Sequence, residues 1–327
     1  MSGAHGIASG TERSRRLSGS KVPRCASCVI ALDLGGTALK AGLVDPAGAT
    51  LLARHRAARR EHGPDAVVAG LLDAVDEMGA AATEAGLVPA AVGLVVPGIV
   101  DEASGVAVFS ANFGWRDLPL RALLEERTGL PVAFGHDVRA GGRAEGALGA
   151  ARGVRDFLFL ALGTGIAGAS VLEGRPYAGG GYAGEIGHVV VESDGRPCGC
   201  GARGCLETVA SAAAIAARYG KGVTAAEVAA RCAASDATAC AVWSEAVDAL
   251  AAALAMYVSV LSPELIVVGG GLSQAGDQLL GPLAAALGRR LTFHRRPALR
   301  RAALGDQAGR LGAALMAWER ARAQVAS

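Results

Sequence analysis

The stretch "CVIALDLGGTALKAGLVD", residues 28–45, determines the fold that this sequence predicts. Its apolar run indicates a buried strand and "LKAGLVD" indicates the return strand, so the chain opens with a hairpin around a glycine turn. Asp33 ends the first strand, Gly35 and Gly36 free the backbone, and Thr37 adds a hydroxyl. Such a turn can point amide N–H groups at a phosphate, while Asp33 can hold Mg²⁺ directly or through water. An ordinary glycine hairpin is the alternative, and this motif alone leaves both readings open.

Two more glycine turns follow later in the chain. "LGTGIAG" at 162–168 repeats the first turn at the end of an apolar strand, and "VVGGGLS" at 267–273 supplies a third turn, flat enough for an adenine or ribose. Lys40, one of only three lysines, stands three residues beyond the first turn. Three glycine turns favour a nucleotide site more than one does. The candidate nucleotide-binding residues are Asp33, Gly35, Gly36, Thr37, Lys40, Gly163, Thr164, Gly165, Gly270 and Gly271.

Strands alternate with helices around these turns. We predict a third strand at "TLLARHRA", a helix at 64–86, a strand at "AAVGLVVPG", a helix at "LRALLEERTG", a strand at "PVAFGH" and a helix at "VRAGGRAEGALGA". Beyond the second glycine turn the chain is predicted to be mostly helical, except for a strand near 264–271. The repeated strand-to-glycine units predict two α/β lobes facing one cleft. Residues 25–135, joined by a C-terminal helix at 306–327, would form the smaller lobe, and 136–305 the larger.

Length and composition agree with two lobes. The chain has 327 residues, more than one compact core normally covers. Its net charge of +2 gives no reason to expect a nucleic-acid partner. Seven cysteines, an odd number, argue against a disulfide framework in a chain of this length. The cysteines that cluster in sequence are therefore interpreted as reduced ligands in a cytoplasmic protein.

Neither export nor membrane insertion is predicted. Residues 1–24 are rich in Ser, Gly and Arg, and no hydrophobic segment follows the pair Arg15-Arg16, so a disordered basic tail is expected rather than a twin-arginine signal. The most apolar helix candidate lies between Asp248 and Glu264. Its fifteen residues are too few to span a bilayer, which predicts a buried core helix.

Asp137 is the candidate acceptor of a proton. It follows a strand and precedes a helix in "FGHDV", where ligands usually meet α/β sheets. A carboxylate there can take the proton of a hydroxyl that attacks a terminal phosphate. An N-cap on the following helix is the alternative. Other side chains able to bind hydroxyls are Asn112, Glu185, His188 and Glu207, and for each of these alone a solvated or capping role remains open.

Seven motifs appear in the order found in ROK-family sugar kinases, which this sequence resembles from Val29 to the C-terminal helix. They are "LDLGGTALKAGLVD", "VPGIVD", "ANFGW", "HDVRAGGRAE", "LGTGIAGA", "GYAGEIGH" and "CGCGARGCLE". The resemblance implies an α/β actin-like ATPase (ribonuclease H-like) fold, with ATP and Mg²⁺ in the cleft and a hexose beside them. It implies Asp137 as catalytic base and a homodimer or homotetramer that uses a surface of the larger lobe. The implied sugar contacts are Gly98, Asn112, His136, Asp137, Glu185, His188 and Glu207.

The glycine-rich stretch after "GEIGH" is interpreted as a metal site. His188, Cys198, Cys200 and Cys205 resemble a Cys₃His zinc site, with four ligands and no open position. Such closure indicates a structural metal, and redox cysteines are the alternative. The site would join the loop carrying Glu207 to the segment carrying Glu185. Cys25 and Cys28 form another C-x-x-C without a second pair and are interpreted as incidental.

His136 departs from the family pattern, in which asparagine usually precedes the catalytic aspartate. The departure leaves the identity of the sugar open; Ala167, where glycine is common, is a minor change. We expect an ATP-dependent kinase acting on the 6-hydroxyl of glucose or N-acetylglucosamine. Alternatives are a kinase for N-acetylmannosamine, allose or fructose, and a sugar-responsive ROK regulator. Such regulators carry a winged helix-turn-helix before the first glycine turn, and only 32 residues precede Asp33. This spacing favours the kinase.

Overall fold

The computed structural model describes residues 26–325, and the hairpin of the opening motif lies at the centre of its first sheet. The strand order is β3-β2-β1-β4-β8, with β1–β2 and β2–β3 antiparallel and β1–β4 and β4–β8 parallel. The strands are β1 (Ser27–Leu34), β2 (Ala38–Val44), β3 (Thr50–Ala57), β4 (Val88–Val96) and β8 (Val132–His136).

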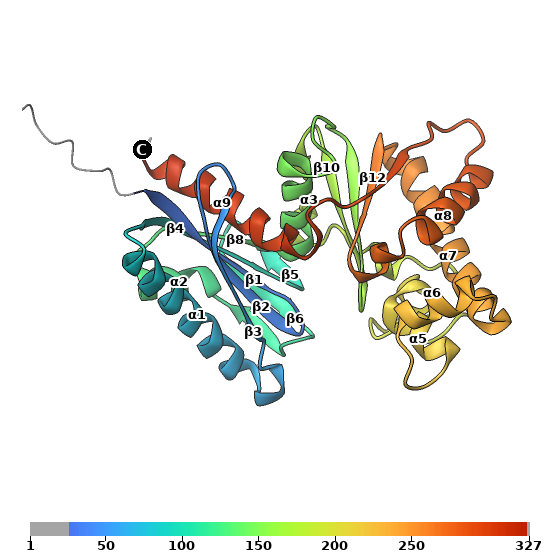
Figure 1. Ribbon diagram of the computed structural model, residues 1–327, viewed down its shortest axis with the longest axis horizontal. Helices are drawn as coiled ribbons and strands as arrows, with labels where there is room; N and C mark the ends of the chain where they lie inside the picture. The colour runs from blue at the N-terminus through green and yellow to red at the C-terminus, as the bar shows by residue number, and fades with distance from the viewer. Residues whose placement is uncertain (1–25, 326–327) are drawn as a thin grey trace, which may run out of the picture.

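Both faces of β1 are buried, because successive side chains point to opposite sides of the sheet. Ile30 and Leu32 pack into a core with helices α1 (Pro64–Glu84) and α2 (Leu120–Thr128). Val29 and Ala31 pack on the other side against α9 (Ala308–Val325). The C-terminal helix therefore completes the lobe that the N-terminal strands begin (Figure 1).

The second sheet repeats this arrangement in the order β11-β10-β9-β12-β13. An antiparallel hairpin, β9–β10, again pairs on its other side with parallel strands, β12 and β13. The strands are β9 (Phe157–Leu162), β10 (Ile166–Leu172), β11 (Arg175–Pro176), β12 (Leu265–Gly269) and β13 (Ala298–Arg301). One face carries the helices α4 (Glu207–Ala210), α5 (Ala212–Tyr219), α6 (Ala225–Ala233), α7 (Ala237–Leu261) and α8 (Asp277–Arg290).

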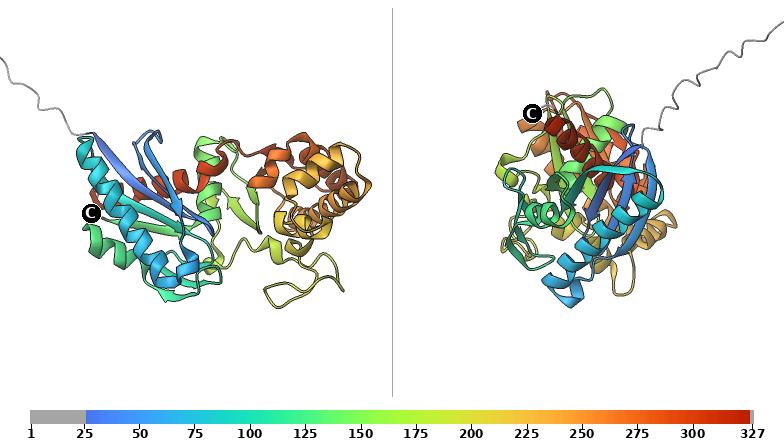
Figure 2. Two further views of the ribbon diagram at one scale, coloured as in Figure 1. Left: turned by 60° about the horizontal axis from the view of Figure 1, so that its bottom comes forward. Right: turned by 90° about the vertical axis from the view of Figure 1, so that its left-hand side faces the viewer.

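Helix α3 (Asp137–Leu148) lies between the two sheets and packs against α9 on one side and β10 on the other. Figures 1 and 2 show an elongated molecule with the sheets toward its two ends and α3 beside the start of α9 between them. Short 3₁₀ turns are η1 (Arg60–His62), η2 (Gly179–Gly181), η3 (Ile186–His188), η4 (Gly271–Ala275) and η5 (Gly305–Gln307).

Several elements differ from the sequence prediction. A small third sheet, β5 (Ile99–Asp101), β6 (Val106–Ser110) and β7 (Trp115–Leu118), was not predicted, and neither were β10, β11 and β13. The predicted tail and Cys25 lie outside the described residues. Cys28 lies in β1 and is completely buried, so its packing explains it.

The prediction that the most apolar helix has only fifteen residues is wrong. α7 has 25 residues, because Asp236 caps its N-terminus by accepting the Ala239 N–H, and the polar residues Glu245 and Asp248 lie on its exposed side. By length and composition α7 is the one helix among residues 26–325 that could cross a membrane. In this structure its apolar residues Leu250, Leu254 and Val258 belong to the core of the second sheet.

Candidate active site and metal centre

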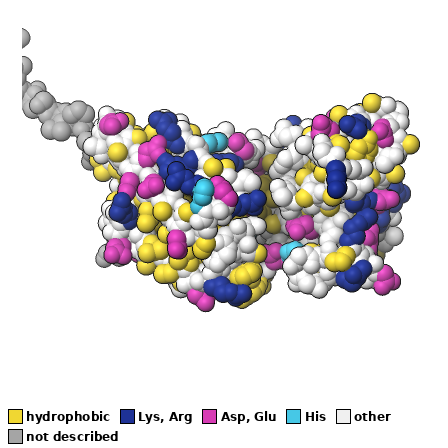
Figure 3. Space-filling model, turned by 90° about the horizontal axis from the view of Figure 1, so that it is seen from below, with side chains coloured by type: hydrophobic (Ala, Val, Ile, Leu, Met, Phe, Trp, Pro, Cys, Tyr) yellow, Lys and Arg dark blue, Asp and Glu magenta, His cyan; other side chains and the backbone are white. Residues whose placement is uncertain are grey.

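A cavity of about 390 Å³ lies between the two sheets and collects residues from distant parts of the chain. A furrow separates the two lobes in the space-filling view, with acidic and histidine side chains at its edge (Figure 3). The lining includes the first glycine turn, the start of α3, the third glycine turn and the segment leading into α9. The polar and glycine residues that line it are Asp33, Gly35, Thr37, Lys40, Asp137, Gly141, Gly270, Gly271, Gln274, Gly305, Asp306 and Gly309.

Asp33 reaches this cavity because the parallel strands β1, β4 and β8 end at the same edge of the sheet. Its side chain is buried, and burial, reinforced by the charge of Asp137, raises its pKa to about 7. Lys40 lies beside it, with Nζ 4.0 Å from Asp33 Oδ2, and donates a hydrogen bond of 2.7 Å to the Asp306 carbonyl. The helix α9 approaches so closely that a Cβ on Gly309 would lie 2.5 Å from the Asp33 carboxylate.

Asp137 is the first residue of α3, and the N-cap position before it belongs to His136. The Val138 N–H donates to His136 Nδ1 at 3.1 Å and to Asp137 Oδ1 at 2.7 Å. Burial raises the pKa of Asp137 to about 6. Burial and the charge of Arg139 lower the pKa of His136 to about 4, so this imidazole is neutral at pH 7. Its proton then lies on Nε2, since Nδ1 accepts a hydrogen bond.

The buried carboxylate of Asp33 and the partly buried carboxylate of Asp137 suit a divalent cation. Asp33 and Asp137 line the same cavity, and loss of hydration raises the pKa of each, so a bound cation would favour their ionised forms. Carboxylate oxygens together with phosphate oxygens are the ligands that Mg²⁺ prefers. Asp33, at the first glycine turn, fits the predicted magnesium contact.

The predicted sugar contacts other than Asp137 do not line this cavity. Asn112 lies in the turn between β6 and β7, where its Nδ2 is 3.9 Å from the position of a Cβ on Gly36. Glu185 is exposed, with Oε2 3.8 Å from His188 Nε2. Gly98 has φ of +108°, and a side chain there would collide with the Phe109 carbonyl, so this glycine also holds the β5–β6 pairing.

Glu207 and the second glycine turn are in contact with each other. Glu207 Oε2 accepts the Ile166 N–H at 2.8 Å, and a Cβ on Gly165 would lie 2.5 Å from the same oxygen. The Gly163 carbonyl accepts the Ala212 N–H, which fixes the turn to the start of α5. Gly163, Thr164 and Gly165 are thus near a predicted sugar contact and do not line the cavity that holds Asp33.

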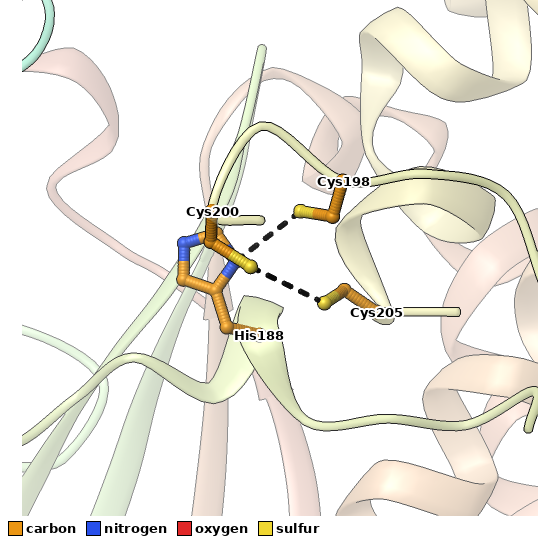
Figure 4. A group of neighbouring side chains, drawn as sticks. All are labelled: His188, Cys198, Cys200 and Cys205. Carbon is orange, nitrogen blue, oxygen red and sulfur yellow. Dashed lines mark hydrogen bonds between the residues drawn. The ribbon is translucent and has the colours of Figure 1, made fainter. Parts of the chain in front are cut away.

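His188, Cys198, Cys200 and Cys205 converge in one cluster, with all four ligand atoms within 4.8 Å of one another. Figure 4 shows the cysteines on a tight loop that faces the histidine. His188 Nδ1 is 3.6 Å from Cys198 Sγ, and Cys200 Sγ is 3.7 Å from Cys205 Sγ. A tetrahedral zinc ion with Zn–S bonds of about 2.3 Å separates its sulfur ligands by about 3.8 Å. The geometry therefore fits zinc, and it leaves His188 Nε2 directed to Glu185.

Three buried charges near the cavity were not identified from the sequence. Arg139 donates from Nε to Glu102 Oε1 at 2.8 Å, and Arg310 contacts Thr50 and Gln307 behind Asp33. Glu145 accepts, among residues 26–325, only backbone N–H groups. Arg139 follows Asp137 by two positions on a helix of small residues, and that spacing was a usable signal. The partners of Arg310 and Glu145 include residues far away in sequence, and no local pattern indicates them.

Repeated hairpin-plus-parallel sheets, a glycine turn beside Asp33 and a cavity between the lobes define the actin-like ATPase class. The sequence matches the model described as "ROK family" over residues 29–320. A glucokinase of Halalkalibacterium halodurans is 36% identical over 276 residues, covering 78% of this chain and 83% of that protein. The chain therefore belongs to the ROK family, and the predicted actin-like fold is confirmed.

Solved structures include both kinases and regulators of this family. A ROK family glucokinase from Streptomyces griseus, in complex with glucose and AMPPNP, has a TM-score of 0.78 at 30% identity, over 89% of this chain and 99% of that one. A ROK family transcriptional regulator, a homologue of the E. coli MLC protein, has a TM-score of 0.83 at 26% identity, over 90% of this chain and 79% of that one. The fold alone does not separate these two functions.

Proposed function

We propose that this protein is an ATP-dependent hexose kinase that transfers the γ-phosphate to the 6-hydroxyl of glucose, with N-acetylglucosamine as the next candidate. The observation that carries the proposal is the presence of Asp33, Lys40 and Asp137 in one interlobe cavity with two glycine turns. A sugar sensor has no need of a buried, desolvated carboxylate beside a phosphate-binding turn. The named glucokinase relative and the glucokinase structure with glucose and AMPPNP support the choice of substrates.

The nucleotide would lie along the cavity between its two glycine turns. The Gly35 N–H closes the turn by donating to the Ala38 carbonyl, so the amide N–H groups of Gly36 and Thr37 would face the phosphates. Gly270 and Gly271, at the end of β12, would face the adenosine. Mg²⁺, when bound near Asp33, supplies the positive charge that phosphoryl transfer requires. Lys40, held by the Asp306 carbonyl, keeps a second positive charge at this end of the cavity.

Asp137 would orient the attacking hydroxyl and accept its proton. Its raised pKa makes Asp137 a stronger base than an exposed aspartate. Because this pKa, about 6, still lies below 7, the group remains mostly ionised at neutral pH. The N-cap position belongs to the neighbouring His136, and Asp137 shares its capping hydrogen bond by accepting the Val138 N–H through Oδ1. Because phosphoryl transfer depends mainly on positioning, the rigid attachment of Asp137 to the first turn of α3 is part of the mechanism.

The sugar would be held by Asn112, His136, Glu185, His188 and Glu207, beside the backbone at Gly98. His136 Nδ1 is occupied by the Val138 N–H, so only its Nε2–H is free to donate to a hydroxyl. An asparagine would offer both a donor and an acceptor. His136 therefore restricts how the sugar binds, and kinases for N-acetylmannosamine, allose or fructose are the alternatives within this activity.

Zinc would have a structural role in this kinase. The four ligands close the coordination sphere, and binding through His188 Nδ1 would fix the ring with Nε2 beside Glu185. Burial and the neighbouring thiols raise the pKa of Cys205 to about 12. Ionising this thiol needs a compensating positive charge, which a bound zinc ion would provide.

A homodimer or homotetramer would use the outer surface of the larger lobe. Phe293 is 88% exposed and Val260, near the end of α7, is 78% exposed. Large apolar side chains that gather on one surface commonly mark a protein contact. The proposed division places residues 25–135 and α9 in the smaller lobe and 136–305, with this surface and the cysteine loop, in the larger lobe.

A coupled ADP-release assay tests the proposed function and the sugar together. Purified protein with MgATP would be offered glucose, N-acetylglucosamine, N-acetylmannosamine, allose and fructose in turn. We expect the highest kcat/KM with glucose or N-acetylglucosamine. Sugar binding without ADP release for any of the five would instead favour the regulator.

A further inference from the structure

Glu145 is a completely buried carboxylate whose three hydrogen bonds, within the described residues, all come from backbone N–H groups. Oε2 accepts from Ala150 at 2.7 Å and from Ala303 at 3.2 Å, and Oε1 accepts from Leu304 at 2.8 Å. A buried carboxylate is costly unless such donors satisfy it. The donors come from two segments more than 150 residues apart, and the carboxylate therefore joins them.

These two segments are the connections between the sheets. The chain passes from β8 to β9 through α3 and residues 149–156, and it returns from β13 to α9 through residues 302–307. Glu145 lies near the end of α3 and holds the start of the first connection beside the middle of the second. Gly149 allows this contact, because a Cβ at that position would collide with Glu145 Oε2.

Both segments continue directly into the candidate active site. Asp137 is the first residue of α3, the helix that ends three residues after Glu145. Leu304 precedes Gly305 and Asp306, which line the cavity, and the Asp306 carbonyl accepts the Lys40 ammonium. One carboxylate thus fixes the spacing between the proposed base and the wall of the cavity that faces the nucleotide.

We propose that Glu145 is a positioning residue that ties the two interlobe connections together and holds residues 304–306 in place to bind the nucleotide. The kinetic part of this inference rests on the proposed kinase function; the structural part does not. Glu145→Gln keeps the size of the side chain but replaces one acceptor oxygen with an NH₂ group, which faces an N–H donor. At least one of the three hydrogen bonds is then lost.

The experiment combines hydrogen exchange with kinetics on the full-length protein. In the unmutated protein we expect the amides of Ala150, Ala303 and Leu304 to be protected to the same degree, relative to the intrinsic exchange rate of each. In Glu145→Gln they should exchange at least about tenfold faster. The KM for MgATP should rise about tenfold while the KM for the sugar changes less than twofold, since Gly305 and Asp306 line the proposed nucleotide cavity and the proposed sugar ligands Asn112, Glu185, His188 and Glu207 do not.

Two variants make the result specific. Gly149→Ala leaves the carboxylate in the chain but pushes it away from its donors, and it should reproduce the same exchange and KM changes. Glu125→Gln is the matched control, because Glu125 accepts the Val132 N–H at 3.3 Å far from the cavity. It should leave all of these values unchanged.

If these three amides were protected to different degrees in the unmutated protein, Glu145 would not link the two connections. This result would overturn the inference even if no variant could be purified. Equal rises in both KM values, or no change in either, would overturn the positioning role. If the unmutated protein phosphorylated no sugar, the proposed function would fail, and AMPPNP affinity would replace KM: an unchanged affinity in both variants would then refute the inference.

Discussion

Replacing Asp137 with asparagine separates catalysis from structure in this protein. The variant keeps the shape of the side chain and the acceptor for the Val138 N–H, but it cannot take a proton. General-base assistance is worth roughly 10²–10⁴ in rate, which corresponds to about 3–5.5 kcal/mol of activation free energy. We therefore expect kcat to fall by this factor, with the Kd for the sugar changed much less.

Although Asp137→Asn should lower kcat, it should not lower the free energy of unfolding. The pKa of Asp137 in the folded protein, about 6, lies above the ordinary value of 3.8, so ionisation destabilises the fold increasingly as pH rises from about 4 through 6. This difference of about 2 pKa units corresponds to roughly 3 kcal/mol at pH 8, as an upper limit. Asp137→Asn removes the charge, and its Tm at pH 8 should be equal to or higher than that of the unmutated protein.

The assay measures kcat by coupled ADP release, sugar affinity by calorimetry and Tm by thermal unfolding. Asp277→Asn is the matched control, since Asp277 is the exposed first residue of α8 and does not line the cavity. The control should keep full activity. An Asp137→Asn variant with unchanged kcat, or with kcat lost only in proportion to a lowered Tm, would refute the assignment of the base.

Four further predictions follow from the site. Cys200→Ser should lower the zinc content from about one per chain and lower the Tm, as metal analysis and thermal unfolding would show; active protein purified without zinc would contradict this. Asp33→Ala should abolish turnover while sugar binding persists, and turnover without Mg²⁺ would show that the cavity has been misassigned. The kcat/KM should fall as pH drops from about 7 to below about 6, where first Asp33 and then the base Asp137 gains a proton; a profile that stays flat down to a pH of about 4 would indicate ordinary, exposed carboxylates. His136→Asn should keep activity but change the ranking among sugars, and an unchanged ranking would remove this side chain from the sugar site.

The sequence predicted those parts of the fold that depend on local patterns. The opening hairpin was predicted because an apolar run, a glycine turn and a second apolar run follow one another directly. The strands β5, β6 and β7 have three to five residues each, too few for a clear alternation, so the turn that holds Asn112 was not placed on a sheet. α7 was predicted too short because its apolar run was taken to begin after Asp248, although Asp248 lies on the exposed side of the helix.

The sequence also predicted those residues of the candidate site that local patterns indicate. Asp33 and Asp137 each end or follow a strand, and parallel strands bring such positions to one edge, so their meeting could be expected. The cysteine spacing likewise indicated a cluster that the structure brings together. Glu145 could not be found in this way, because Ala303 and Leu304 lie 158 and 159 residues away and contribute only backbone groups.

Identification of the phosphorylated product tests the central claim most directly. The full-length protein would be incubated with MgATP and glucose labelled with ¹³C at C6, and the products followed by ³¹P and ¹³C NMR. We predict one ADP for each glucose 6-phosphate, with coupling between phosphorus and the labelled carbon. ADP formed without a sugar phosphate, or a phosphate on any other carbon, would contradict the proposal that Asp137 activates the 6-hydroxyl.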